Sequence, residues 1–135
     1  MMNCHQVFTG YMHPEPVSKG GVVDNYFTDA EMKCKCCGKI EMDPEFMGRL
    51  NTARAYADFP FSITSGYRCE RHNRDVKSTS NNHVVGKAAD ILCQGSVKRF
   101  DMIDAMMRAG MLGIGCGMGF IHCDINRKER MFWTY

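Results

Sequence analysis

The chain has 135 residues, a length that suits one domain around one hydrophobic core. Its net charge of +2 is too small to indicate a nucleic-acid-binding surface, and no stretch approaches the roughly 18 apolar residues of a membrane helix. Residues 1–20 lack the basic segment and apolar run of a signal peptide, so we expect synthesis in the cytoplasm without one. We expect a monomer without a membrane span and without a nucleic-acid partner.

The sequence changes near residue 26 from an irregular segment to one with the patterns of a folded domain. Residues 1–25 contain prolines and glycines without any periodicity, which predicts an irregular N-terminal arm. The folded domain is then expected to span residues 26–135. It opens with a short helical turn, because Thr28 and Glu31 have the spacing of a capping box.

A longer helix is expected after the glycine of residue 38. Asp43 is a suitable N-cap, Pro44 suits the first helical position, and apolar residues then recur at three- and four-residue spacing up to residue 57. The alternation over residues 61–65 predicts a strand. Residues 70–82 are polar and lack a core pattern, so they are predicted to form a loop.

The second half of the chain adds further strands and one helix. Residues 88–92 read as a buried strand. Ser96 is expected to cap a helix that ends near Gly110, and its apolar residues are expected to face the core: Phe100, Ile103, Met106, Met107 and Met111. A glycine-rich loop is predicted over 115–119, followed by strands at 120–125 and 131–135. This order favours an α+β domain with a small, mainly antiparallel sheet and flanking helices.

Two histidines and two aspartates lie in segments that otherwise predict buried strand. His83 and Asp90 are seven residues apart, and Gly86 between them permits the bend that would let both side chains converge. His122 and Asp124 alternate on a later strand, so both side chains point to one face. Imidazole nitrogens and carboxylate oxygens are ligands that zinc prefers, and a buried carboxylate needs a cation or a donor. The spacing therefore predicts one zinc site.

Four of the eight cysteines form a second group, which consists of Cys34, Cys36, Cys37 and Cys69. Disulfides are disfavoured in a reducing compartment, so free thiols are the simplest interpretation. A disulfide within the group and a structural zinc site remain alternatives, although zinc sites have better spacing than C-x-C-C.

Three stretches of the sequence resemble the motifs of the zinc D-Ala-D-Ala carboxypeptidase-like peptidases. These stretches are Ser65-Gly66-Tyr67-Arg68, His83-x-x-Gly86-x-Ala88-x-Asp90 and Gly119-Phe120-Ile121-His122-x-Asp124. The family includes bacterial cell-wall carboxypeptidases, phage endolysin peptidases and, distantly, the hedgehog signalling domain. The resemblance extends from about Phe27 to Tyr135 and implies a hedgehog/D-Ala-D-Ala-peptidase-like fold.

The resemblance also implies roles for individual residues. His83, Asp90 and His122 match the family's ligands for Zn²⁺. Arg68 matches an arginine that contacts substrate and stabilises the developing oxyanion, a task that suits a permanently charged, planar group of donors. The alternative for Arg68 is an arginine that only anchors a loop.

The sequence departs from the family pattern at the catalytic base. Many members have Asp or Glu three residues before the last zinc histidine, where this chain has Gly119. We therefore predict Asp124 as the base. The alternatives are that Asp124 orients His122 or pairs with the arginine, and that Glu70 or Asp75 is the base.

The predicted function is zinc-dependent hydrolysis of peptide bonds in the stem or cross-link peptides of bacterial peptidoglycan, by carboxypeptidase or endopeptidase action. Without a signal peptide, a phage lysis enzyme or a virion component acting on the cell wall is the expected setting. One alternative is a non-catalytic zinc-containing binding module that recognises cell wall or a protein partner. Another is a structural zinc protein in which Cys123 or Cys93 supplies a fourth ligand.

Overall fold

A computed structural model describes residues 25–135 of the chain. The irregular arm predicted over residues 1–25 lies, apart from its last residue, outside the described part. The helices and the sheet described below lie within residues 26–135, the range predicted for the domain. Within the described part, no helix is both long and apolar enough to cross a bilayer.

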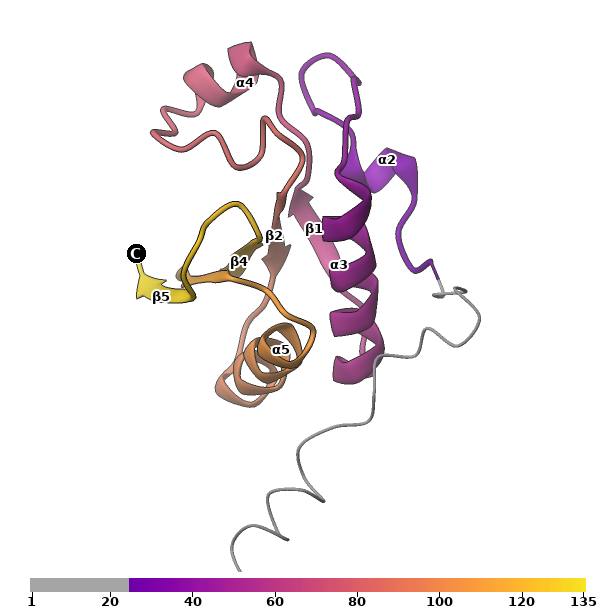
Figure 1. Cartoon of the computed structure of the whole chain (residues 1–135), viewed down its shortest axis with the longest axis vertical. Coiled ribbons are helices and arrows are strands. Elements are labelled where there is room, and N and C mark those ends of the chain that lie inside the picture. Colours follow the sequence, from indigo (N-terminus) through magenta and orange to yellow (C-terminus); the bar gives the residue numbers. More distant parts are fainter. Residues whose placement is uncertain (1–24) are drawn as a thin grey trace, which may run out of the picture.

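A five-stranded sheet forms the centre of the domain (Figure 1). Its order across the sheet is β1-β2-β4-β3-β5, where the strands are β1 (Ser62–Ser65), β2 (Ala88–Leu92), β4 (Phe120–Asp124), β3 (Gly113–Cys116) and β5 (Met131–Thr134). The pairings β1–β2, β2–β4 and β3–β4 are antiparallel, and β5 joins β3 in parallel. The prediction of an α+β fold with a mainly antiparallel sheet is confirmed.

The helices flank this sheet: α2 (Asp29–Met32), α3 (Pro44–Ala57), α4 (Glu70–Asp75) and α5 (Ser96–Arg108). The capping box of Thr28 and Glu31 is present at α2. At α3 the Asp43 carboxylate accepts from the Phe46 amide, as the sequence predicted. Because α3 and α5 pack against each other, they build a layer over the central strands.

The two faces of the sheet have different roles. Alternate residues of β2 and β4, among them Ile91, Ile121 and Cys123, join a buried apolar core that includes Leu50 of α3 and Met106 of α5. The residues between them point to the opposite face, as strand geometry requires. That second face carries the charged residues of β2 and β4, so the helices support the functional face from behind.

Two segments predicted as loops are regular elements in the structure. Residues 70–75 form α4, in which Asn73 is the one buried residue, so the helix carries no apolar periodicity that a sequence could reveal. Residues 113–116 form β3, and a Cβ on Gly115 would come within 2.6 Å of the Trp133 ring. Glycine here makes room for a neighbouring side chain and does not mark a loop.

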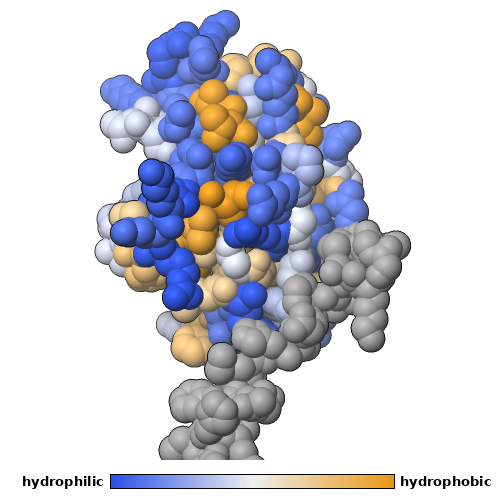
Figure 2. All heavy atoms as spheres, in the orientation of Figure 1, coloured by the Kyte–Doolittle hydropathy of each residue, from blue (hydrophilic) through white to orange (hydrophobic). Residues whose placement is uncertain are grey.

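The predicted α5 also needs two corrections. Its N-cap is Gly95 without a side-chain hydrogen bond, so Ser96 does not cap the helix but begins it. Phe100 and Met107, which were predicted to face the core, are exposed, whereas Met102 and Met106 are buried. The apolar stripe is thus rotated relative to the prediction. Figure 2 shows that apolar residues on the viewed face form small groups between hydrophilic ones.

Substitution of Gly86 by alanine is expected to lower the free energy of unfolding strongly. Gly86 has a φ of +71°, and a Cβ there would lie 2.0 Å from the Glu41 carbonyl oxygen. A left-handed non-glycine residue costs about 1–3 kcal/mol, and overpacking costs a further 1–3 kcal/mol or so. Urea denaturation measures the change. Gly48→Ala in α3 is the control, because a Cβ there meets nothing within 4 Å and should stabilise by about 0.5–1 kcal/mol.

Candidate metal centre and its pocket

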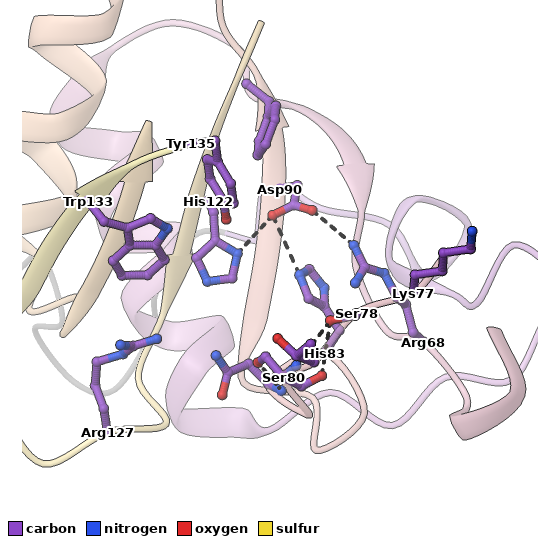
Figure 3. Close-up of a pocket in the computed structure, with 13 residues that line it drawn as sticks. Arg68, Lys77, Ser78, Ser80, His83, Asp90, His122, Arg127, Trp133 and Tyr135 are labelled. Carbon is purple, nitrogen blue, oxygen red and sulfur yellow. Dashed lines mark hydrogen bonds and ion pairs between the residues drawn. The ribbon is translucent and has the colours of Figure 1, made fainter. Parts of the chain in front are cut away.

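The three predicted zinc ligands converge on one face of the sheet (Figure 3). Asp90 on β2 lies directly opposite His122 on β4 in the antiparallel register. His83 reaches the same place from the turn that ends at Gly86, so the predicted bend is present. Potential ligand atoms of the three residues all lie within 4.8 Å of one another.

The distances between these atoms suit a small tetrahedral cation. Asp90 Oδ1 lies 2.9 Å from His122 Nδ1 and 3.5 Å from His83 Nε2. Zinc bonds to nitrogen and oxygen are about 2.0–2.2 Å, so neighbouring ligands in a tetrahedron are about 3.3–3.6 Å apart. The three residues therefore fit zinc with little rearrangement and leave room for a fourth ligand.

Hydrogen bonds on the outer nitrogens orient both imidazole rings. His83 Nδ1–H donates to the carbonyl oxygen of Gly66 at 2.8 Å, which leaves the lone pair of Nε2 directed at Asp90. His122 Nε2–H donates to Asp124 Oδ2 at 2.7 Å, which leaves the lone pair of Nδ1 directed at Asp90. Metal-binding histidines typically have such a carboxylate or carbonyl partner on the second nitrogen. These outer partners suit a metal site, because each would hold its ring with the inner nitrogen facing the place of an ion.

Both carboxylates of the site remain ionised. Burial raises the pKa of Asp90, but its close contacts with the His122 and His83 rings outweigh burial and hold that pKa well below its usual range. For Asp124, burial is likewise outweighed by the hydrogen bonds from His122 and Arg127, so its pKa is also lowered. Negative charge therefore lies on both sides of His122, which favours a cation between the ligands.

Asp124 contacts His122 and the guanidinium group of Arg127, an arginine that was not predicted to take part in the site. Its side chain is fully buried, and Arg127 donates to both of its oxygens, at 2.8 Å from Nε and 2.7 Å from Nη2. Asn82 Nδ2 is a further donor at 3.4 Å. The role of Asp124 as base stays a prediction. Its contacts favour the alternative in which the carboxylate orients His122, and its partner is Arg127 rather than Arg68.

Arg68 lies on the opposite side of the ligands. Its Nη2 is 3.1 Å from Asp90 Oδ2, and its Nε donates to Ser65 Oγ at 2.9 Å. Nη1 is 3.5 Å from Asn73 Oδ1, a residue of α4. Three elements thus fix the direction of the guanidinium group. The placement brings it beside the ligand atoms, as the predicted contact with substrate requires.

The three ligands open into a pocket of about 430 Å³. Its cationic residues are Arg68, Lys77 and Arg127, and the aromatic rings of Trp133 and Tyr135 form part of its wall. Asp90 supplies the one carboxylate in the lining contributed by residues 25–135. The alternative bases Glu70 and Asp75 do not line it, and Asp75 instead lies 3.9 Å from Arg71. The pocket therefore suits an anionic or carboxylate-bearing peptide.

Three residues that contact the site were not predicted from the sequence. Arg127 and Asn82 bind Asp124, and Trp133 lies with its ring 5.5 Å from the His122 ring and beneath the Arg127 guanidinium. A signal was available for Arg127, since a buried aspartate requires a cation and Arg127 follows three residues later. Trp133 resembles a residue of the same peptidase family, but its place beside His122 depends on an edge strand, and Asn82 lies in a loop without a motif.

The predicted alternative of a cysteine as fourth ligand concerns Cys93 and Cys123. Both side chains belong to the hydrophobic core on the helix-covered face of the sheet. Cys123 lies between His122 and Asp124 on β4 and points away from both, as strand alternation requires. The ligand group formed by the described residues contains neither cysteine.

The fold and the site agree with those expected of the zinc D-Ala-D-Ala carboxypeptidase-like peptidases. A family model described as Peptidase M15 matches residues 25–124, which is most of the chain, and the protein belongs to this family. The resemblance drawn from the three motifs is thereby confirmed. No curated protein matches the chain closely enough to count as a recognisable relative.

Proposed function

We propose that the protein is a zinc-dependent peptidase that hydrolyses peptide bonds in the stem or cross-link peptides of bacterial peptidoglycan. The observation that supports this most is the convergence of His83, Asp90 and His122, each oriented by a further partner, at the base of a cation-lined pocket. We also propose that it acts on the cell wall as a phage lysis or virion protein.

The proposed division of roles follows from the contacts. His83, Asp90 and His122 would hold zinc, which supplies Lewis acidity for an amide carbonyl and for a water molecule. Asp124 holds the tautomer of His122, and Arg127 keeps Asp124 ionised. Arg68 donates to the oxygen that becomes negative during amide hydrolysis. Lys77 and Arg127 attract the carboxylates of a stem peptide.

Metal dependence tests this proposal. Purified protein incubated with peptidoglycan or soluble muropeptides is expected to release new amino groups, and the release is expected to stop with a chelator and return with added zinc. Mass spectrometry of the released fragments distinguishes cleavage before the terminal residue from cleavage within the stem. Absence of any zinc-dependent amine release would contradict the peptidase assignment.

Replacement of Arg68 by glutamine is expected to lower kcat/KM by about 10²–10³-fold, the usual effect of losing one donor to a developing oxyanion. Zinc content should remain unchanged, because Arg68 contacts Asp90 Oδ2 whereas the histidines face Oδ1. Steady-state kinetics with a muropeptide, combined with metal analysis, measures both effects. Arg71→Gln is the matched control, since this exposed arginine of α4 does not line the pocket. Loss of zinc in the Arg68 variant would point to a role in anchoring the site.

A second candidate function is recognition without catalysis. It is favoured by one observation, namely that the pocket lining within residues 25–135 offers no carboxylate other than Asp90 to accept a proton from water. A binding module would retain zinc and bind muropeptides, with no release of amines on long incubation. Equilibrium binding measured alongside the hydrolysis assay separates the two functions.

A further inference from the structure

Four cysteine side chains gather at a place remote from the proposed peptidase ligands. Cys34, Cys36 and Cys37 lie on the loop that follows α2, and Cys69 is the N-cap of α4, more than thirty positions later in the chain. Their four sulfur atoms all lie within 4.8 Å of one another. Chain proximity explains the first three but not the fourth, which the fold brings to them.

The distances do not suit a disulfide but do suit metal thiolates. Cys36 Sγ lies 3.6 Å from Cys34 Sγ and 3.3 Å from Cys69 Sγ, whereas a disulfide bond is about 2.05 Å long. Zinc–sulfur bonds of about 2.3 Å place neighbouring sulfurs of a tetrahedron about 3.8 Å apart. All seven cysteines of residues 25–135 are free thiols. The group therefore has the size of a four-sulfur coordination shell.

The backbone around these cysteines forms a tight turn. The Cys34 amide donates to the Lys39 carbonyl at 2.7 Å, and the Gly38 amide donates to the Cys34 carbonyl at 2.8 Å. Gly38 has a φ of +77°, which turns the chain after Cys37. Within the C-x-C-C run, Cys34 and Cys37 also have the C-x₂-C spacing that is common for zinc.

Backbone amides point at two of the sulfurs. The Cys69 amide donates to Cys34 Sγ at 3.4 Å, and the His72 amide donates to Cys69 Sγ at 3.4 Å. Hydrogen bonds of this kind orient ligand atoms and stabilise thiolates. Cys34 is buried, whereas Cys36 and Cys37 are exposed, so an ion can enter from solvent.

We propose that Cys34, Cys36, Cys37 and Cys69 bind a second zinc ion in a structural, four-sulfur site. Four protein ligands close the coordination shell, so this site has no position for substrate. The ion would join the loop after α2 to the segment that carries Arg68. The same two segments already meet through the Tyr67 amide, which donates to the Met32 carbonyl at 2.8 Å. Because Cys69 follows Arg68 directly in the chain, zinc binding by Cys69 would also restrict the position of Arg68.

Metal content of the full chain tests this proposal independently of peptidase activity. Protein purified under reducing conditions and loaded with zinc is expected to contain two zinc ions. Protein loaded with Co²⁺ is expected to show sulfur-to-cobalt charge-transfer absorption in the near ultraviolet, which histidine and carboxylate ligands do not produce. This spectroscopic test needs no substitution, so it remains decisive if a cysteine variant fails to fold.

Substitutions show which group of ligands binds each of the two zinc ions. Cys36→Ser with Cys69→Ser should lose one zinc ion and the charge-transfer band, whereas loss of His83 should remove one ion and leave the band. Cys116→Ser is the control, because Cys116 lies on β3 outside the group and should retain both ions and the band. A single ion with no thiolate band, or a mass two daltons lower that shows a disulfide, would overturn the proposal. A red iron-loaded protein would overturn the choice of zinc.

Discussion

Replacing His83 by glutamine is expected to remove one zinc ion per chain and to reduce peptidoglycan hydrolysis by more than about 100-fold. Losing only a hydrogen-bond partner of a zinc ligand costs about 10–100-fold in metal affinity or activity, so losing the ligand itself should cost more. His83 is buried, and its Nε2 is directed toward Asp90 by the bond from Nδ1 to Gly66. Glutamine has no aromatic nitrogen to replace Nε2.

Metal analysis and the amine-release assay measure this result, with circular dichroism to confirm that the variant is folded. His72→Gln is the matched control, because His72 lies on α4 and its side chain is outside the ligand group. A His83 variant that retains full zinc content and activity would exclude His83 as a ligand.

Replacing Asp124 by asparagine separates the two roles considered for this residue. If Asp124 orients His122, zinc affinity is expected to fall by about 10–100-fold, and activity should recover at saturating zinc. Stability should also fall, since a buried pair that loses one charge is destabilised by about 3–5 kcal/mol. We expect this outcome because both carboxylate oxygens are already engaged by Arg127 and one by His122.

The opposite outcome would identify the base. Activity that stays lost at saturating zinc, with unchanged zinc affinity, would mean that Asp124 accepts the proton during hydrolysis. Competition with a chromophoric chelator measures the affinity, and hydrolysis across a zinc titration measures the activity. Arg127→Gln is the matched variant: it removes the cation but keeps the carboxylate, so it should lose stability while Asp124 still holds His122.

Much of the fold was predictable because its signals are local. The cap of α3 at Asp43 and the alternation that predicted β1 depend on neighbouring residues alone, and the structure contains both. The predictions failed where a residue type is required by a partner that lies far away in the sequence. Gly115 is a strand residue because Trp133 occupies the space of a side chain, and no local pattern conveys that.

The site shows the same division. The spacing of His83, Gly86 and Asp90, with His122 on a later strand, was sufficient to predict that three ligand residues meet. The need of a buried aspartate for a cation was a signal for Arg127, but the geometry of that pair depends on the turn between β4 and β5 and could not be predicted. The sequence grouped Cys69 with the earlier cysteines but could not show that their sulfur atoms meet, since this depends on how the segment after β1 packs against the loop after α2.

Because β5 is an edge strand, one wall of the pocket is held less firmly by the sheet than the other. His122 and Asp90 lie on strands that are hydrogen-bonded on both sides, whereas Trp133 lies on an edge strand held by β3 alone, with Met131 and Phe132 exposed. Edge segments with few buried contacts open locally at lower free energy than central strands. The aromatic wall is therefore expected to open at a lower free energy than the central strands, so the proposed polymer substrate could enter while the three ligand residues keep their geometry.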